Sequence, residues 1–150
     1  MNRLNRVTLI LETNHTDIQM KQVHVTAAVI IRQGKILCVQ RGENKLEYIS
    51  KKWEFPGGKV ELGEELNTTI KREILEELKL QISVREFLIQ INHEYPDFKL
   101  KMDTFVCEIE SGEPVLTEHL DYKWLSKNEL LQLDWAAADV PIVEKLLSNE

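Results

Sequence analysis

The segment from Leu66 to Leu78 constrains the fold of this chain more than any other part of the sequence. Its apolar residues recur at every fourth position, at Leu66, Ile70, Ile74 and Leu78. This period is typical of an amphipathic α-helix. In such a helix Glu73, Glu76 and Glu77 fall within one narrow arc. Like charges at these spacings destabilise a bare helix by about 0.2–0.5 kcal/mol per pair, so we expect a cation beside them.

The three glutamates predict a site for a divalent metal ion. Ligands that are all oxygens favour Mg²⁺ or Mn²⁺ over Zn²⁺, which prefers His or Cys among its ligands. The natural partner of such a metal is phosphate. The alternative is a solvated acidic helix face, which is what runs of charge usually form. The fixed spacing of the residues around the glutamates argues for the metal site.

That spacing forms a longer motif. Gly58 is followed after five residues by Glu64, and after seven more by the run from Arg72 to Leu80. The segment resembles the Nudix box of the Nudix hydrolases, which reads Gly, five residues, Glu, seven residues, Arg-Glu, apolar, any, Glu-Glu, any, Gly, apolar. Only Lys79 departs, because the family has Gly there. Since that Gly provides a left-handed turn after the helix, we expect altered capping and retained activity.

The resemblance implies both a fold and a reaction. It implies an α/β (α+β) Nudix fold, a three-layer α/β/α sandwich with a mixed β-sheet. It also implies Mg²⁺-dependent hydrolysis of a nucleoside triphosphate to a nucleoside monophosphate and pyrophosphate, as in MutT-like enzymes. Two alternatives stay open, namely hydrolysis of another nucleoside diphosphate derivative such as ADP-ribose, and a nucleotide-sensing module without activity.

By the same resemblance, specific residues would surround the metal. The carbonyl oxygen of Gly57 would join Glu73, Glu76 and Glu77, and Glu118 would supply another metal-binding or base-like carboxylate. The remaining two predicted catalytic residues lie within the box itself. Arg72 would orient a ligand carboxylate, because its planar guanidinium suits that contact. Glu64 would tune the metal shell, or would simply be a favourable acidic residue at the positive helix end.

Four further residues are predicted to bind substrate. Arg41 and Lys59 lie where MutT-like enzymes carry cations that meet phosphate, although an isolated cation is more often a surface residue. Phe55 would form a wall of the base pocket, and Asp139 would read the edge of the base. Asp139 is equally well placed as the N-cap of the helix that follows.

The identity of the base stays open in the sequence. An Asp at position 139, where other relatives have Asn, resembles the CTP pyrophosphohydrolase branch of the family more than MutT itself. The two competing substrate classes are therefore oxidised purine triphosphates such as 8-oxo-dGTP, and pyrimidine triphosphates such as CTP and dCTP. His119 beside Glu118 is a weaker candidate for a general base.

Composition limits the partners of the chain. Its 150 residues fit one domain, and its net charge of −6 argues against polymeric DNA or RNA as substrate. No apolar stretch reaches the ~18 residues of a membrane span, so we expect a cytoplasmic protein without membrane contact, as a monomer or homodimer. We also expect Cys38 and Cys107 to be buried and reduced.

Apolar runs and turn residues predict the remaining elements. Residues 1–22 form an N-terminal extension that could add an edge strand, and residues 23–150 form the Nudix domain. Pro56 and the paired glycines after it lead us to expect no regular element from Trp53 to Lys59. Strands are expected over residues 24–31, 35–40, 81–91, 100–109 and 122–125, and later helices over 127–133 and 139–148.

Overall fold

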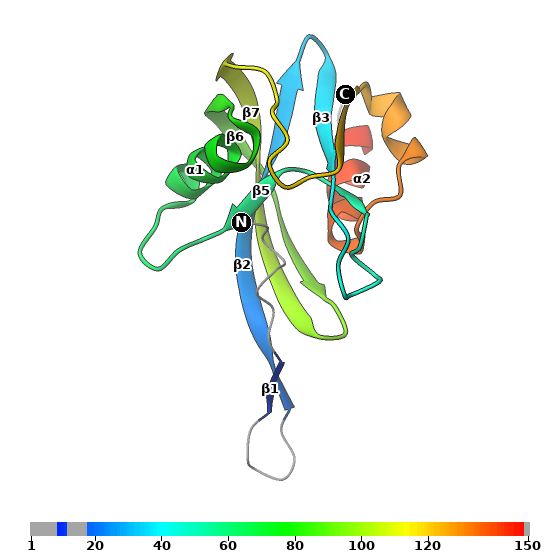
Figure 1. Ribbon diagram of the computed structural model, residues 1–150. Helices are drawn as coiled ribbons and strands as arrows, with labels where there is room; N and C mark the ends of the chain where they lie inside the picture. Colours follow the sequence, from blue (N-terminus) through cyan, green and yellow to red (C-terminus); the bar gives the residue numbers. More distant parts are fainter. Residues whose placement is uncertain (1–8, 12–17, 149–150) are drawn as a thin grey trace.

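A mixed sheet runs through the centre of the computed structural model, which describes residues 9–11 and 18–148 (Figure 1). Its main strand order is β4-β3-β2-β7-β6, while β1 and β5 also pair with β2 and β8 pairs with β3. Strands β2 and β7 are parallel, and the other pairs are antiparallel. The strands are β1 (Leu9–Leu11), β2 (Ile18–Arg32), β3 (Lys35–Gln40), β4 (Trp53–Glu54), β5 (Gly57–Lys59), β6 (Gln81–Glu94), β7 (Phe98–Ser111) and β8 (Asp121–Leu125).

The central strand β2 supplies side chains to two separate cores. Val25 and Val29 point into the core on one face of the sheet, whereas Ala28 and Ile30 point into the core on the other. This follows from the alternation of side chains along a strand, and a strand covered on both faces is apolar throughout.

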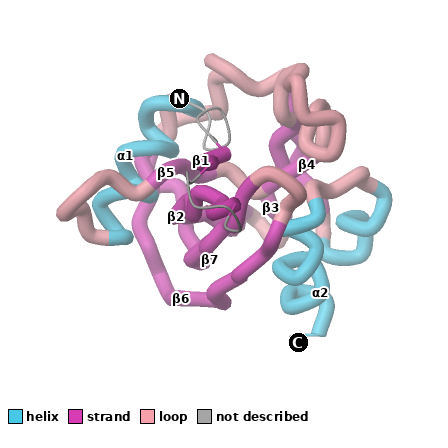
Figure 2. The backbone as a smooth tube through the Cα atoms, turned by 90° about the horizontal axis from the view of Figure 1, so that it is seen from below, coloured by secondary structure: helices cyan, strands magenta, loops and turns pink. Residues whose placement is uncertain are grey.

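Helices cover the two faces of the sheet. Helix α1 (Leu66–Leu78) packs Ile70, Ile74 and Leu78 into one core, and helix α2 (Val140–Ser148) packs its buried side chains into the other. Figure 2 shows the two helices on opposite sides of the strands. The three-layer α/β/α sandwich predicted from the sequence is therefore confirmed.

Helix α1 has the predicted bounds and an unusual end. Lys79 follows the helix with φ 58° and ψ 31°, in the left-handed region, and its N–H donates to the carbonyl of Leu75 at 3.1 Å. The backbone thus keeps the turn for which the family uses Gly. A non-glycine residue in this conformation costs about 1 kcal/mol, so helix capping is retained at some expense in stability.

The expectation of no regular element between Trp53 and Lys59 was wrong. Trp53–Glu54 forms β4 beside β3, and Gly57–Lys59 forms β5 beside β2. Pro56 lies between the two strands and interrupts neither. A Cβ atom on Gly57 would lie 2.0 Å from the carbonyl oxygen of Thr26, so the glycine allows β5 to lie against β2.

Both helices predicted near the C-terminus are present, and they differ in helix type. Lys127–Gln132 is a 3₁₀-helix, η1, in which Ser126 and Glu129 form a capping box. A second 3₁₀-turn, η2 (Ala137–Asp139), leads directly into α2. Within residues 9–11 and 18–148, every helix is too short or too polar to cross a membrane.

Two other expectations concern the N-terminal extension and the cysteines. Strand β1 pairs with β2, and the expected boundary between residues 22 and 23 falls inside β2. Cys38 and Cys107 are buried free thiols in separate cores, as predicted, and burial raises the pKa of each to about 12. Trp124 is partly buried against the core that contains Cys107, and the Arg32 guanidinium lies 4.3 Å from the centre of its ring.

Candidate functional site

Glu73 of α1 lies against the backbone of β5. A Cβ atom at Gly58 would lie 2.1 Å from the Glu73 carboxyl carbon, so the glycine leaves the space that this carboxylate occupies. Oε1 of Glu73 accepts a hydrogen bond from Arg72 Nη1 at 2.7 Å. Oε2 is buried and has no hydrogen-bond partner among the described residues. Burial raises the pKa of Glu73, while Arg72 acts in the opposite direction.

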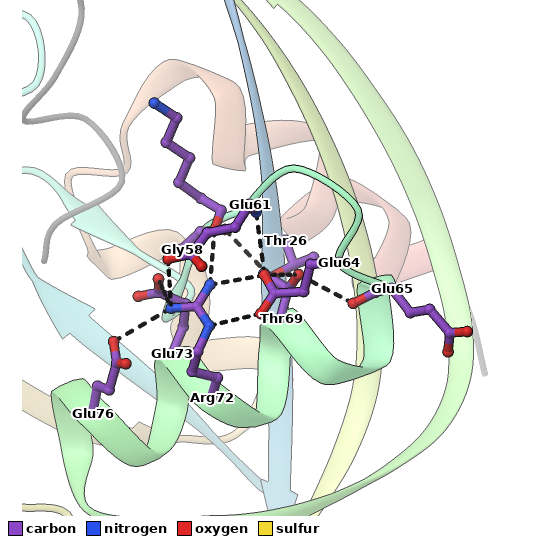
Figure 3. Close-up of polar contacts among 10 residues, drawn as sticks. Thr26, Gly58, Glu61, Glu64, Glu65, Thr69, Arg72, Glu73 and Glu76 are labelled. Carbon is purple, nitrogen blue, oxygen red and sulfur yellow. Dashed lines mark hydrogen bonds and ion pairs between the residues drawn. The ribbon is translucent and has the colours of Figure 1, made fainter.

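Arg72 joins the helix to the loop before it (Figure 3). Its Nε donates to Glu64 Oε2 at 2.8 Å and its Nη2 to Glu64 Oε1 at 2.9 Å, which makes a forked pair. The same Nη2 also donates to the carbonyl of Lys59 at 3.1 Å. One guanidinium group thereby fixes Glu64, Glu73 and the end of β5 relative to one another.

Glu64 is held by α1 as well as by Arg72. Its Oε1 accepts a hydrogen bond from Thr69 Oγ1 at 2.6 Å, and Arg72 is the main cause that lowers the pKa of Glu64 to about 2. These contacts are those of a carboxylate that orients its neighbours. They are also compatible with the alternative role at the start of the helix, because Thr69 lies in the first turns of α1.

Glu77 is the most strongly perturbed acid of the cluster. Its side chain is buried, and burial raises the pKa to about 9, with further contributions from the charges of Glu54, Glu73 and Glu118. Burial and the neighbouring negative charges both favour the neutral, protonated form of this carboxyl group. Glu76, the third glutamate of the motif, lies at the exposed margin of the helix, 3.4 Å from Arg72 Nη1.

Glu54 belongs to this acidic cluster and was not singled out from the sequence. It is buried in β4, where His119 Nε2 lies 3.2 Å from Oε2 and Arg41 Nη1 lies 3.6 Å from Oε1. The signal that could have identified it is a charged residue between Trp53 and Phe55. Buried carboxylates require a cationic or hydrogen-bonding partner.

Arg41 therefore lies inside the site, only 1% exposed, and not on the surface. Arg41 lies beside Glu54, and its contact with the phosphate of a substrate stays a prediction. Lys59 is partly exposed at the end of β5, and its predicted contact with phosphate also stays a prediction.

Glu118 is exposed on a loop that is attached to the end of α1. Thr117 Oγ1 donates to the carbonyl of Glu77 at 2.8 Å, and Val115 N–H donates to the carbonyl of Leu78 at 2.9 Å. The loop thus satisfies carbonyl groups in the last turn of α1 that have no partner within the helix. Because the two segments are joined, Glu118 lies close enough to raise the pKa of Glu77.

Phe55 and Asp139 are brought together where the segment before α2 packs beside β4. Asp139 Oδ1 accepts the backbone N–H of Phe55 at 3.0 Å, and both residues are fully buried. The Phe55 ring stacks on Trp135 with centroids 4.7 Å apart. Backbone hydrogen bonds also run from Trp53 N–H to the carbonyl of Asp134 and from Ala136 N–H to the carbonyl of Trp53, both at 2.8 Å. The segment ending in Asp139 therefore lies alongside β4.

Comparison with known proteins agrees with this geometry. The sequence profile of the NUDIX domain matches residues 26–145 of the chain. The chain belongs to the Nudix family. The predicted family and the prediction that the protein is an enzyme, a Nudix hydrolase, are both confirmed.

Individual Nudix proteins resemble most of the chain. The chain is 33% identical over 129 residues to the CTP pyrophosphohydrolase of Escherichia coli (strain K12), covering 86% of this chain and 94% of that protein. It is 34% identical over 97 residues to the 8-oxo-dGTP diphosphatase of Buchnera aphidicola subsp. Acyrthosiphon pisum, covering 65% and 78%. The solution structure of the MutT protein, a Nudix hydrolase, from methicillin-resistant Staphylococcus aureus 252 has a TM-score of 0.67 and 40% identity, covering 85% and 97%.

The Nudix box residues provide suitable donors for a divalent cation. As the side chains are placed, no three His, Cys, Asp or Glu groups in the described part of the chain converge as metal ligands. Arg72 contacts both Glu73 and Glu76 in this arrangement, and it neutralises part of their charge. The donor set nevertheless fits the ion, because it consists of carboxylate oxygens and includes the buried Oε2 of Glu73.

Proposed function

We propose that this Nudix hydrolase cleaves a nucleoside triphosphate to a nucleoside monophosphate and pyrophosphate, with Mg²⁺ as its cofactor and Mn²⁺ as a possible substitute. The observation that supports this most strongly is the buried carboxylate cluster. Glu73 and Glu77 are both buried on α1. Glu73 lies next to Gly58, and Glu77 lies within the electrostatic influence of Glu54 and Glu73. Acidic groups are rarely gathered and buried without a cation to bind.

In this proposal the metal is held by Glu73, Glu76 and Glu77, together with Glu118 and the carbonyl oxygen of Gly57. A bound divalent cation supplies Lewis acidity toward phosphate oxygens and lowers the pKa of water. The reaction adds a water oxygen to phosphorus, breaks one phosphoanhydride bond and releases a proton.

The protein side chains position the reacting groups. Arg72 holds the Glu73 carboxylate through a charge-assisted hydrogen bond and is itself fixed by Glu64. Lys59 and Arg41 meet phosphate groups of the substrate. Because positioning accounts for most of the catalysis in phosphoryl transfer, residues that orient the carboxylates matter as much as those that bind.

For the base, we propose cytosine, in CTP or dCTP. The hydrogen bond from Phe55 N–H to Oδ1 of Asp139 holds these two residues side by side. A carboxylate accepts hydrogen bonds, and the exocyclic N4 amino group of cytosine donates them. The similarity to a CTP pyrophosphohydrolase supports the same base.

A second candidate is 8-oxo-dGTP, the substrate named for other relatives of similar identity. In that case the enzyme would clear oxidised nucleotides.

The test measures the products that the purified protein releases with Mg²⁺, namely pyrophosphate from CTP, dCTP, the other nucleoside triphosphates and 8-oxo-dGTP, and AMP from ADP-ribose. We expect release to be greatest with CTP or dCTP, and to fall by several orders of magnitude in Glu77→Gln, a variant of nearly equal volume. A clear preference for 8-oxo-dGTP would select the second candidate. The absence of pyrophosphate release with every triphosphate would reject the proposed reaction.

A further inference from the structure

The turn that carries Asp139 is fixed from two directions. On one side, Oδ1 of Asp139 accepts the backbone N–H of Phe55 at 3.0 Å. On the other side, the backbone N–H of Ala138 donates to the hydroxyl oxygen of Tyr95 at 2.9 Å. Ala138 is 1% exposed and Tyr95 3% exposed, so water has little access to either group.

Tyr95 is itself held firmly in the connection between β6 and β7. Its backbone N–H donates to the carbonyl of Phe98 at 2.8 Å, which closes the turn. Its ring lies between aromatic neighbours, with centroids 5.0 Å from Phe98, 5.3 Å from Tyr48 and 4.4 Å from His93. A phenol anchored in this way presents its oxygen at a fixed place.

We propose that Tyr95 is a positioning residue for base recognition, whose hydroxyl group fixes the Ala137–Ala138 peptide and thereby the turn that carries the base-reading carboxylate of Asp139. This inference rests on the proposed function, in which Asp139 contacts the base. The hydrogen bond from Ala138 N–H holds the Ala137–Ala138 peptide, one residue before Asp139, and the hydrogen bond from Phe55 N–H holds the carboxylate. Loss of either contact frees the turn to move.

Removing the hydroxyl group is expected to affect recognition more than chemistry. In Tyr95→Phe the ring and its packing remain, but the Ala138 N–H loses its acceptor in a buried place. A buried donor without a partner is unfavourable, so the turn rearranges to find one. The three metal-binding glutamates of the box lie on α1, which packs on the opposite face of the sheet from the Tyr95 core, so we expect them to keep their places.

The experiment compares kcat and KM for the preferred nucleotide and for a triphosphate with a different base, in the wild type, Tyr95→Phe and Tyr48→Phe. Tyr48 provides the matched control, because its ring stacks on Tyr95 while its hydroxyl donates to Asp97. In Tyr95→Phe we expect KM for the preferred nucleotide to rise and the ratio of kcat/KM between the two bases to fall by roughly tenfold, with kcat and the Mg²⁺ dependence unchanged. In Tyr48→Phe the ratio should stay at the wild-type value.

Thermal unfolding of each variant separates positioning from simple loss of stability. A lower melting temperature with an unchanged base ratio would show that Tyr95 only stabilises the fold, and would overturn the inference. An equal drop in the ratio for both variants would also overturn it, because the effect would then not depend on Ala138.

Asp139→Asn distinguishes this inference from the proposed function. If Asp139→Asn changes the base ratio and Tyr95→Phe does not, the inference fails and base reading by Asp139 stands. If Asp139→Asn leaves the ratio unchanged, base reading by Asp139 fails and the role of Tyr95 fails with it. In the double variant we expect no further change in the base ratio beyond that of Asp139→Asn, since both substitutions act through the contact between Asp139 and the base.

Discussion

Replacing Glu77 with Gln should stabilise the metal-free protein while it removes activity. Folding places this carboxyl group where burial and three nearby carboxylates raise its pKa from 4.5 to about 9. At pH 7 the unfolded chain gains the free energy of ionising Glu77, whereas the folded chain keeps it protonated. Each unit of pKa difference corresponds to about 1.4 kcal/mol, and the interval from 4.5 to pH 7 gives an upper limit of about 3 kcal/mol.

The direction of the Glu77 pKa shift determines how the free energy of unfolding changes with pH. Because the folded pKa lies above the unfolded value, Glu77 contributes most to stability below pH 4.5, and this contribution is lost as the pH rises toward 9. Gln does not ionise, so Glu77→Gln should raise the free energy of unfolding by about 1–3 kcal/mol at pH 7 and by little near pH 4.5.

The assay is urea unfolding of both proteins between pH 4.5 and 9, first with EDTA and then with Mg²⁺. Mg²⁺ should stabilise the wild type by mass action and should stabilise Glu77→Gln much less. Glu76→Gln is the matched control, because it is the same change on the same helix at an exposed position, where we expect less than about 0.5 kcal/mol without metal. A Glu77→Gln variant that is less stable than the wild type in EDTA would refute this account of the cluster.

Three further predictions concern the rest of the Nudix box. Lys79→Gly should raise the free energy of unfolding by about 0.5–1 kcal/mol without changing activity, because Lys79 occupies a left-handed conformation; chemical denaturation and pyrophosphate release check both. Gly58→Ala should lower kcat by roughly a hundredfold or more, because the new methyl group occupies the place of the Glu73 carboxylate; steady-state kinetics beside a circular dichroism spectrum would detect an unfolded variant instead. Arg72→Lys should lose the forked pair with Glu64, whose pKa of about 2 contributes stability above pH 4.5 that is lost as the pH falls toward 2. Acid unfolding should therefore begin at a higher pH in that variant, and an unchanged acid midpoint would contradict the role of this pair.

The parts of the fold that the sequence predicts are those determined by local pattern. Both ends of helix α1 were predicted correctly, because the apolar period and the spacing of the Nudix box agree over the same segment. Strands β4 and β5 were missed because each depends on a partner far away in the chain. The segment around Gly57 was expected to form no regular element, whereas the lack of a side chain at Gly57 allows close packing against Thr26 within the sheet.

The residues of the candidate site also fall into those that local sequence pattern predicts and those that depend on distant parts of the chain. The carboxylates of α1 are close in sequence, so the helical period was enough to group them. Glu54 and His119 are separated by 65 positions, and no local pattern shows that their side chains meet. Phe55 and Asp139 are 84 positions apart, and only the family resemblance placed them in one pocket before the structure joined them by a hydrogen bond.

The two basic groups of the site neutralise its two sides, and this arrangement explains the behaviour of Glu77. Arg72 is paired with Glu64 and Glu73 on one side, and Arg41 lies beside Glu54 on the other. Glu77 lies within the influence of both groups of carboxylates, and burial and their charges raise its pKa. A proton therefore balances this carboxylate in the metal-free protein. A divalent cation that binds at Glu77 must replace that proton, so the apparent affinity for Mg²⁺ should increase with pH as the proton becomes easier to remove.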